Sequence, residues 1–219
     1  MSGPTIKHIL PFIVFVLFLA GHEYIPMPPV WEYPFRVAVM AAVLFFVSRG
    51  VIDLRVREWA GSIGIGVGVF AVWIAPDLLW PHYRESVLFQ NAITGKIAGS
   101  VPDALHTSWL VLVFRTIRAS IIVPIVEELF WRGWLMRWIV NPDFEKIPLG
   151  TYAANAFWIT AVLFASEHGP YWEVGLVAGI AYNWWMIRTK SLSDCILAHA
   201  ITNALLSCYV IMYGQWQYW

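Results

Sequence analysis

Charged residues are scarce in this sequence. Only 13% of the 219 residues are charged, whereas 59% are hydrophobic and 14 are tryptophan; the mean hydropathy is +0.64. A soluble domain of this length needs far more polar residues to cover its surface. The composition therefore excludes an ordinary soluble domain and indicates an integral membrane protein whose main partner is the lipid bilayer.

Net charge and clustered basic residues are also missing. The 14 Lys and Arg residues balance 14 Asp and Glu residues, and no basic stripe runs along any segment, so nucleic acid is not expected as a partner.

Cysteine is rare. Cys195 and Cys208 fall in one predicted helix, too far apart to form a disulfide, and we interpret both as packing residues.

Long apolar runs fill the chain. A helix needs about 20 residues to cross the roughly 30 Å hydrocarbon core, and the candidate spans are residues 5–21, 34–48, 60–81, 108–140, 152–168, 172–187 and 193–213. We predict an all-α polytopic membrane protein with about seven transmembrane helices, eight being the alternative. Residues 1–219 are expected to form a single integral membrane domain, and the oligomeric state is left open.

Three segments need separate interpretation. The first run follows a single Lys as in a signal peptide, but without a convincing cleavage site we interpret it as a retained helix. Residues 81–106 are polar enough to form a loop and could hold an interfacial helix. The segment YGQWQYW, residues 213–219, is expected to anchor the chain in the headgroup layer, which favours amphipathic rings.

The distribution of Lys and Arg predicts the orientation. Seven spans divide the cationic residues into one group of Lys7, Arg49, Arg55, Arg57, Arg137, Lys146, Arg188 and Lys190, and an opposing group of Arg36, Arg84 and Lys96. The positive-inside rule places the larger group in the cytoplasm. The N-terminus is therefore expected in the cytoplasm and the C-terminus outside.

The first polar motif within an apolar stretch is PIVEELFWRGWL, residues 124–135. Glu128 and Arg132 are four apart on one helix face, where they can form an ion pair that neutralises both. Glu127 points about 100° away and keeps a free carboxylate, and Pro124 can kink the helix beside it. A charge in hydrocarbon costs about 2.5–3.5 kcal/mol, so we interpret the motif as functional, with a structural charge cluster as the alternative.

Two further motifs contain histidine. FASEHGP places Phe164 and His168 one helical turn apart, and LAHAITN places His199 and Asn203 on one face of an apolar helix. Taken alone, His168 is better explained as a capping or interfacial residue, and His199 is equally well explained as a packing residue bonded to Asn203. With Glu127 they supply a base, two imidazoles and an amide, which together can activate a water and stabilise a tetrahedral oxyanion.

The three motifs resemble, in order and spacing, those of the CPBP (or Abi) family of CAAX prenyl endopeptidase type II and bacteriocin-processing intramembrane proteases. The family motifs are Glu-Glu-x-x-x-Arg, Phe-x-x-x-His and His-x-x-x-Asn. The run GLVAGIAYNWWMIRTKSLSDCILAHAITN is also similar to the family. The resemblance covers about residues 113–210, the expected catalytic core, and implies an endopeptidase whose helices enclose an intramembrane catalytic cavity.

The resemblance also implies a role for each matched residue. The catalytic residues would be Glu127, His168, His199 and Asn203, supported by Glu128, Arg132 and Phe164. Glu127 would be the general base, and His168 would position or protonate the water. His199 and Asn203 would stabilise the oxyanion. The supporting glutamate and arginine would hold the geometry and charge of the base.

The cofactor stays open between two mechanisms. Glu127, His168 and His199 would be the ligands of a zinc protease, whereas a glutamic protease needs no cofactor. The chain has no His-Glu-x-x-His to place two zinc ligands one turn apart, and Asn203 is a poor zinc ligand but a good oxyanion donor. We therefore favour the glutamic mechanism, with zinc as the alternative.

Family members differ in substrate. Eukaryotic relatives remove the last three residues of prenylated proteins, while bacterial members act in bacteriocin immunity or in sorting of surface proteins. The compact chain favours protein sorting at a bacterial inner membrane, with cleavage near the C-terminal membrane-associated segment of a membrane-tethered protein. The alternatives are a non-proteolytic immunity or scaffold protein and a proton-coupled transporter.

Position along the spans raises two further questions. Arg115 and Arg118 could bind a substrate carboxylate or a lipid phosphate, although snorkelling to the interface is the preferred interpretation. At 1.5 Å per residue, Glu127 lies about 12 Å from the outer face and His199 about 9 Å from the inner face. The catalytic groups can meet only if the fifth span is short or tilted.

Overall fold

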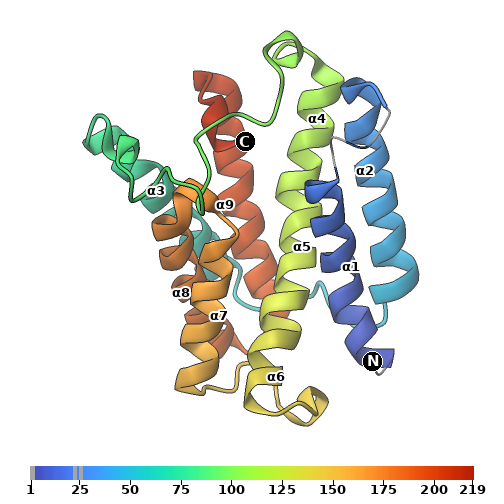
Figure 1. Ribbon diagram of the computed structural model, residues 1–219. Helices are drawn as coiled ribbons and strands as arrows, with labels where there is room; N and C mark the ends of the chain where they lie inside the picture. Colours follow the sequence, from blue (N-terminus) through green and yellow to red (C-terminus); the bar gives the residue numbers. More distant parts are fainter. Residues whose placement is uncertain (1–2, 22–23, 25–26) are drawn as a thin grey trace.

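The computed structural model describes residues 3–21, 24 and 27–219 as a helical bundle (Figure 1). The described part of the chain has no β-strand beyond one isolated bridge between Asn91 and Gly95. In chain order the α-helices are α1 (Gly3–Ala20), α2 (Pro29–Val43), α3 (Trp59–Leu79), α4 (Trp109–Ile117), α5 (Val123–Glu128), α6 (Met136–Val140), α7 (Ala154–Ser166), α8 (Trp172–Thr189) and α9 (Leu192–Tyr213). The predicted all-α polytopic fold is confirmed.

The long apolar helices match the predicted spans. Among the described residues, five helical stretches are long and apolar enough to cross a membrane: Gly3–Ala20, Val30–Ser48, Trp59–Leu79, Trp109–Val140 and Leu192–Tyr213. The other two predicted spans also form helices. α7 has only 13 residues, and α8 has 18 residues but carries Glu173 in its first turn and Arg188 in its last.

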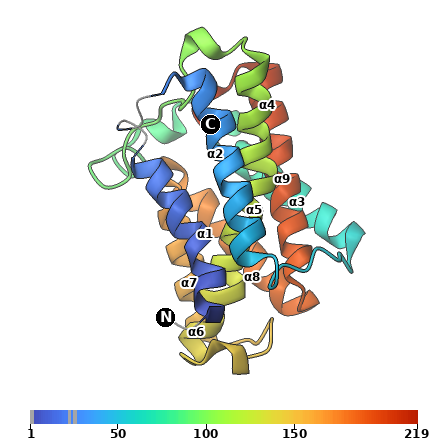
Figure 2. The ribbon, with the colours of Figure 1, turned by 90° about the vertical axis from the view of Figure 1, so that its right-hand side faces the viewer.

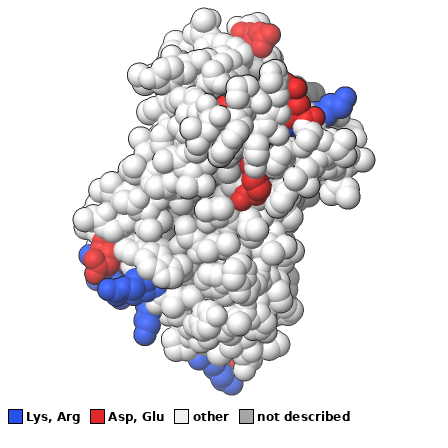
Figure 3. Space-filling view, turned by 90° about the vertical axis from the view of Figure 1, so that its left-hand side faces the viewer, with Lys and Arg blue, Asp and Glu red and all other residues white. Residues whose placement is uncertain are grey.

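The seven helical passes run alternately up and down the bundle. The N-terminus lies at the lower end and the C-terminal segment at the upper end (Figures 1 and 2). On the face drawn in Figure 3, most Lys and Arg atoms lie toward the lower end, and the Asp and Glu atoms lie mainly in the upper half. On this face most Lys and Arg atoms therefore gather toward one end of the bundle.

The connecting segment between α3 and α4 is a loop at the upper end of the bundle. It holds two short 3-10 helices, Tyr83–Glu85 and Asp103–Leu105, and a turn at Asn91, where the side chain accepts hydrogen bonds from the amides of Ile93 and Thr94. The loop prediction is confirmed, whereas an interfacial α-helix does not form there. Short-range side-chain bonds to the backbone favour turns over helix.

Small residues allow close packing of the helices that carry the site. A Cβ atom added at Gly66 of α3 would lie 2.5 Å from the carbonyl oxygen of Ala198 on α9, and one at Gly61 would lie 2.3 Å from the Trp185 ring on α8. In hydrocarbon, helices associate through such close contacts because apolar surface gains nothing by leaving lipid. α3, α8 and α9 therefore form a tightly packed group beneath the site.

The helical stretch Trp109–Val140 changes its winding twice. Arg118–Ile122 and Leu129–Leu135 are π-helical, and α5 lies between them. Pro124 has no N–H to donate, so the regular bonding pattern cannot continue through this region. The irregularity expected at Pro124 takes the form of a widened turn, a feature often found at functional sites.

Candidate active site

The two adjacent glutamates of α5 have different surroundings. Glu127 is 7% exposed and lines a cavity, and its Oε2 atom has no hydrogen-bond partner among the described residues. Glu128 is fully buried and does not line that cavity. The sequence predicts that Glu127 keeps a carboxylate free of a cation, and its position agrees with that prediction.

Glu128 joins two motifs through one oxygen atom. Its Oε1 accepts a hydrogen bond from Nη1 of Arg132 at 3.0 Å and lies 2.9 Å from Nδ1 of His199. The predicted ion pair of Glu128 with Arg132 is confirmed. Because a carboxylate accepts, Nδ1 of His199 carries the proton, which leaves Nε2 as the atom available to a ligand. The sequence does not predict this bond to His199.

Arg132 is anchored by α8 as well as by Glu128. Its Nε donates to Oδ1 of Asn183 at 2.8 Å, and its Nη2 donates to the carbonyl oxygen of Gly179 at 3.2 Å. The Nδ2 of Asn183 in turn donates to the carbonyl oxygen of Phe157 on α7. The sequence analysis did not single out Asn183. Its polar amide in the middle of the apolar run GIAYNWW is the feature that could have identified it.

His168 follows the C-terminal end of α7. Its Nδ1 lies 2.8 Å from the carbonyl oxygen of Phe164, the other member of its motif. A carbonyl can only accept, so this bond also places the proton on Nδ1 and leaves Nε2 free. On the other side, a Cβ atom added at Gly175 of α8 would lie 3.0 Å from Nδ1 of His168. The absence of a side chain at Gly175 therefore makes room for the imidazole.

His199 and Asn203 project from one side of α9. The His199 ring stacks on Tyr182 with centroids 5.0 Å apart. The Nδ2 atom of Asn203 donates to the carbonyl oxygen of Ala119 at 2.8 Å. Ala119 lies in the first π-helical turn, so the widened turn supplies the acceptor that orients Asn203. One N–H of the amide remains for a ligand.

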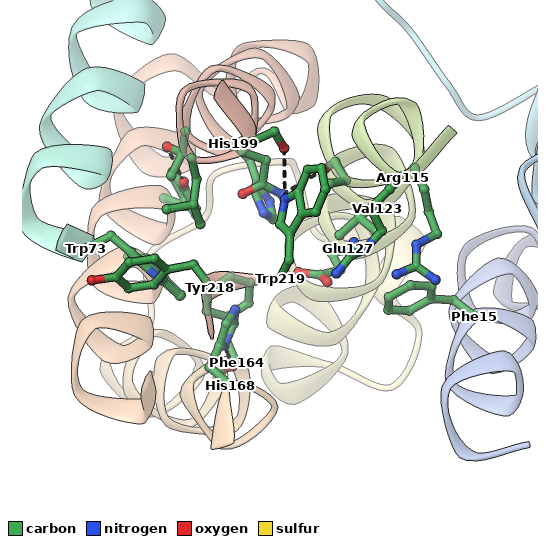
Figure 4. A pocket seen from close by; sticks show the side chains of 18 of the residues that line it. Phe15, Trp73, Arg115, Val123, Glu127, Phe164, His168, His199, Tyr218 and Trp219 are labelled. Atoms are coloured by element: carbon green, nitrogen blue, oxygen red, sulfur yellow. Dashed lines mark hydrogen bonds between the residues drawn. The ribbon is translucent and has the colours of Figure 1, made fainter. Parts of the chain in front are cut away.

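These residues line one cavity of about 210 Å³. Glu127, His168 and His199 surround it, and Asn203 contributes to its wall (Figure 4). The sequence analysis requires a short or tilted fifth span if the catalytic groups are to meet. The helix formed there, α7, has only 13 residues, and His168 just beyond its end reaches the level of the other two motifs. Phe164 lines the same cavity and lies 4.6 Å from the guanidinium of Arg132, measured to the ring centroid.

Other parts of the wall come from outside the motifs. Trp73 of α3 lies 5.2 Å from the His168 ring, centroid to centroid, and the cavity is also lined by Tyr218 and Trp219 (Figure 4). The Nε1 of Trp219 donates to Oγ of Ser207 at 3.3 Å. The interpretation of residues 213–219 as a membrane anchor alone is therefore wrong, because this segment folds over the bundle and closes part of the cavity.

Glu127, His168 and His199, the ligands of the zinc alternative, line one cavity. Among the described residues, no three His, Cys, Asp or Glu side chains are arranged to hold a metal ion. Nδ1 of each histidine is bonded to a protein oxygen, an arrangement that leaves Nε2 free and suits a zinc ligand as well as a catalytic histidine. The glutamic mechanism stays a prediction, with zinc as its alternative, and the chemistry below is written for the glutamic mechanism.

Residues 107–205, a little under half of the chain, match the family model of the Rce1-like type II CAAX prenyl endopeptidases. The matched segment contains all three motifs and every cavity residue that they supply. This match supports the resemblance of the motif-bearing segment to the CPBP family. Comparison with curated proteins and with solved structures gave no significant match. In general terms the match supports a CAAX-type intramembrane endopeptidase that acts on a membrane-associated substrate.

Proposed function

We propose that this protein is a glutamic intramembrane endopeptidase of the CPBP family that hydrolyses a peptide bond near the C-terminal membrane-associated segment of a tethered protein. The observation that carries the proposal is the single cavity in which an unpaired carboxylate, two imidazoles and an amide meet. Each has an atom free to bind a reactant, and together they match what hydrolysis requires.

Glu127 is the general base of this mechanism. Its carboxylate removes a proton from a water molecule, and the resulting hydroxide attacks the carbonyl carbon of the substrate. His168, with its proton on Nδ1, presents the Nε2 lone pair and holds the same water by accepting its second hydrogen. Because Arg132 is bonded to Glu128, the base keeps a carboxylate that no cation neutralises directly.

The tetrahedral oxyanion is bound on the opposite side of the cavity. In its protonated form His199 donates through Nδ1 to Glu128 and through Nε2 to the oxyanion. Asn203 donates its remaining N–H. Preorganised donors of this kind each contribute roughly 10²–10³ in kcat.

Collapse of the tetrahedral intermediate completes the reaction. The carbon–nitrogen bond breaks, and the proton taken up by Glu127 passes to the departing nitrogen. The products are a peptide with a new carboxyl group and a peptide with a new amino group. Glu127 is returned to its carboxylate form, and neither an oxidant nor a second substrate is needed.

The charge distribution supports an orientation for this chemistry. The cationic loops at the lower end of the bundle support a cytoplasmic N-terminus under the positive-inside rule. Arg115, Arg118 and Trp219 line the cavity. The upper part of the bundle holds α4 and the C-terminal segment (Figure 1), so substrate would enter from the non-cytoplasmic side. We propose that the protein works in a bacterial inner membrane in the sorting of proteins with C-terminal membrane anchors.

The test uses purified protein in lipid nanodiscs with a library of lipid-tethered peptides, analysed by mass spectrometry. Cleavage is expected to fall about 10²–10⁴-fold in Glu127→Gln and to be unchanged in Glu145→Gln, which alters an exposed loop glutamate. Full cleavage by Glu127→Gln would overturn the mechanism. Proton flux without cleavage would favour a transporter, and a cellular phenotype unaffected by Glu127→Gln would favour a scaffold.

A further inference from the structure

A second pocket, of about 440 Å³, adjoins the catalytic cavity at the upper end of the bundle. We call it the arginine pocket after Arg36 of α2, Arg115 of α4 and Arg118, which all line it. Arg115 and Arg118 also line the catalytic cavity. The two spaces therefore share a wall, and a molecule bound in one can extend toward the other.

The arginine pocket has an excess of positive charge. Glu32 is the one acidic residue among the described residues that line it, and it forms an ion pair with Arg36. Arg115 has only neutral partners, donating from Nη2 to Oγ of Ser100 at 3.2 Å and lying 5.3 Å from the Trp219 ring. Among the side chains, three cations against one anion leave two positive charges without an acidic partner.

Arg118 is the least satisfied of the three. It is 7% exposed, yet it forms no hydrogen bond or ion pair with any described residue, and its nearest aromatic neighbour is the Tyr33 ring at 5.8 Å. The Nε atoms of Arg36, Arg115 and Arg118 are all buried without an acceptor. Snorkelling is therefore wrong for Arg118, since its charge is buried in the protein.

A buried, unpaired guanidinium is costly, and it is retained where an anion completes it. Guanidinium groups present parallel N–H donors that match the two oxygens of a carboxylate. We propose that the arginine pocket binds a carboxylate of the substrate peptide. This carboxylate belongs to the shorter of the two fragments that cleavage releases. This proposal rests on the proposed peptidase function.

The spacing along the helix supports a substrate group over a lipid. Arg118 and Glu127 are nine positions apart, which is roughly 13 Å at 1.5 Å per residue. An extended peptide covers about 3.3–3.6 Å per residue, so a carboxylate about four residues beyond the scissile bond reaches Arg118. A lipid phosphate needs no such connection to the catalytic cavity, and Arg118 is shielded from the surrounding bilayer.

Binding is tested in the inert Glu127→Gln protein, in nanodiscs of phosphatidylcholine. The probes are two lipid-tethered peptide libraries that contain the same mixture of random sequences. One library has a free C-terminal carboxylate, and the other has a C-terminal amide. We expect the carboxylate library to bind about tenfold more tightly and to lose that advantage in Arg118→Gln. Arg188→Gln, at an exposed position on α8, is the matched control and should keep it.

Three outcomes decide the proposal. Equal binding of both libraries overturns it, as does an advantage retained in Arg118→Gln. The third outcome comes from nanodiscs that contain phosphatidylglycerol. If this lipid stabilises the protein, if Arg118→Gln removes that stabilisation, and if the two libraries bind equally, the pocket binds lipid phosphate and the proposal is overturned. If Arg118→Gln does not fold, Arg118→Lys keeps the charge without the paired donors and should retain only part of the advantage.

Cleavage assays separate this proposal from the proposed function. In a protein with native Glu127, Arg118→Gln should raise KM for the carboxylate library about tenfold and remove the preference of cleavage for the carboxylate library over the amide library. Carboxylate-selective binding without any cleavage would support the arginine pocket and count against the peptidase. Cleavage that is indifferent to the carboxylate would support the peptidase and overturn the pocket.

Discussion

The Oε1 atom of Glu128 lies 2.9 Å from Nδ1 of His199, although the two residues are 71 positions apart in the chain. The same oxygen binds Arg132. This contact gives the two adjacent glutamates different roles, because Glu128 orients other side chains and Glu127 does not. Glu128 is therefore a positioning residue, and its neighbour faces the cavity.

The first prediction concerns the stability of the two glutamate variants. Glu128→Ala leaves the buried cation of Arg132 without its partner and should lower the free energy of unfolding by about 3–5 kcal/mol. Glu127→Ala removes an unpaired carboxylate and should be neutral or stabilising. Thermal unfolding of both variants in the same detergent measures the difference. Equal destabilisation would contradict the separate roles of the two residues.

The second prediction concerns the space beside His168. Gly175→Ala places a methyl group 3.0 Å from Nδ1 of His168 and must displace the imidazole. A shift of about 1 Å can reduce the rate roughly 10²-fold, while alanine favours the helix and should preserve stability. Gly68→Ala is the control, since nothing lies within 4 Å of the added atom. A similar kcat for both variants would argue against a role for His168.

The third prediction concerns Asn183. Asn183→Leu leaves Nε of Arg132 and the carbonyl oxygen of Phe157 unpaired in the protein interior, and each such group costs about 1–3 kcal/mol. Unfolding should occur at lower temperature, and cleavage should fall because Arg132 no longer fixes Glu128. The control is Trp184→Leu at the next position, which is 49% exposed and should behave like the native chain.

The fourth prediction concerns metal removal. If the reaction runs through Glu127 without a metal, dialysis against a strong chelator should leave kcat unchanged, and added zinc should not raise it. Elemental analysis of the purified protein, performed on the same sample as the cleavage assay, makes the result quantitative. Loss of activity on chelation that stoichiometric zinc restores would establish the zinc mechanism instead.

Much of the fold follows from the sequence because hydrocarbon imposes a strong condition on the backbone. Every lipid-exposed peptide group must be bonded within its own segment, so long apolar runs become helices. The seven runs are all helical, and Cys195 and Cys208 are free in α9 as predicted. The extent of the single domain over residues 1–219 stays a prediction, as do the catalytic roles.

The sequence also predicts side-chain pairs within a helix, but it does not predict contacts between helices. The four-residue spacing of Glu128 and Arg132 predicts their ion pair because helix geometry is fixed. Bonds between segments, such as Asn203 to Ala119, depend on the rotation and depth of two packed helices. No local pattern specifies these, and the same is true of the fold of residues 213–219 over the cavity.

The sequence by itself determined that the chain is helical, that lipid surrounds it, and which few polar side chains must face inward. These conclusions follow from composition and from periodicity within single helices, which are local properties. The tertiary structure alone decided that Glu128 holds His199, that Asn183 holds Arg132, and that three arginines line a pocket beside the catalytic cavity. Those relationships depend on how α5, α8 and α9 pack, and packing is a property of the whole chain.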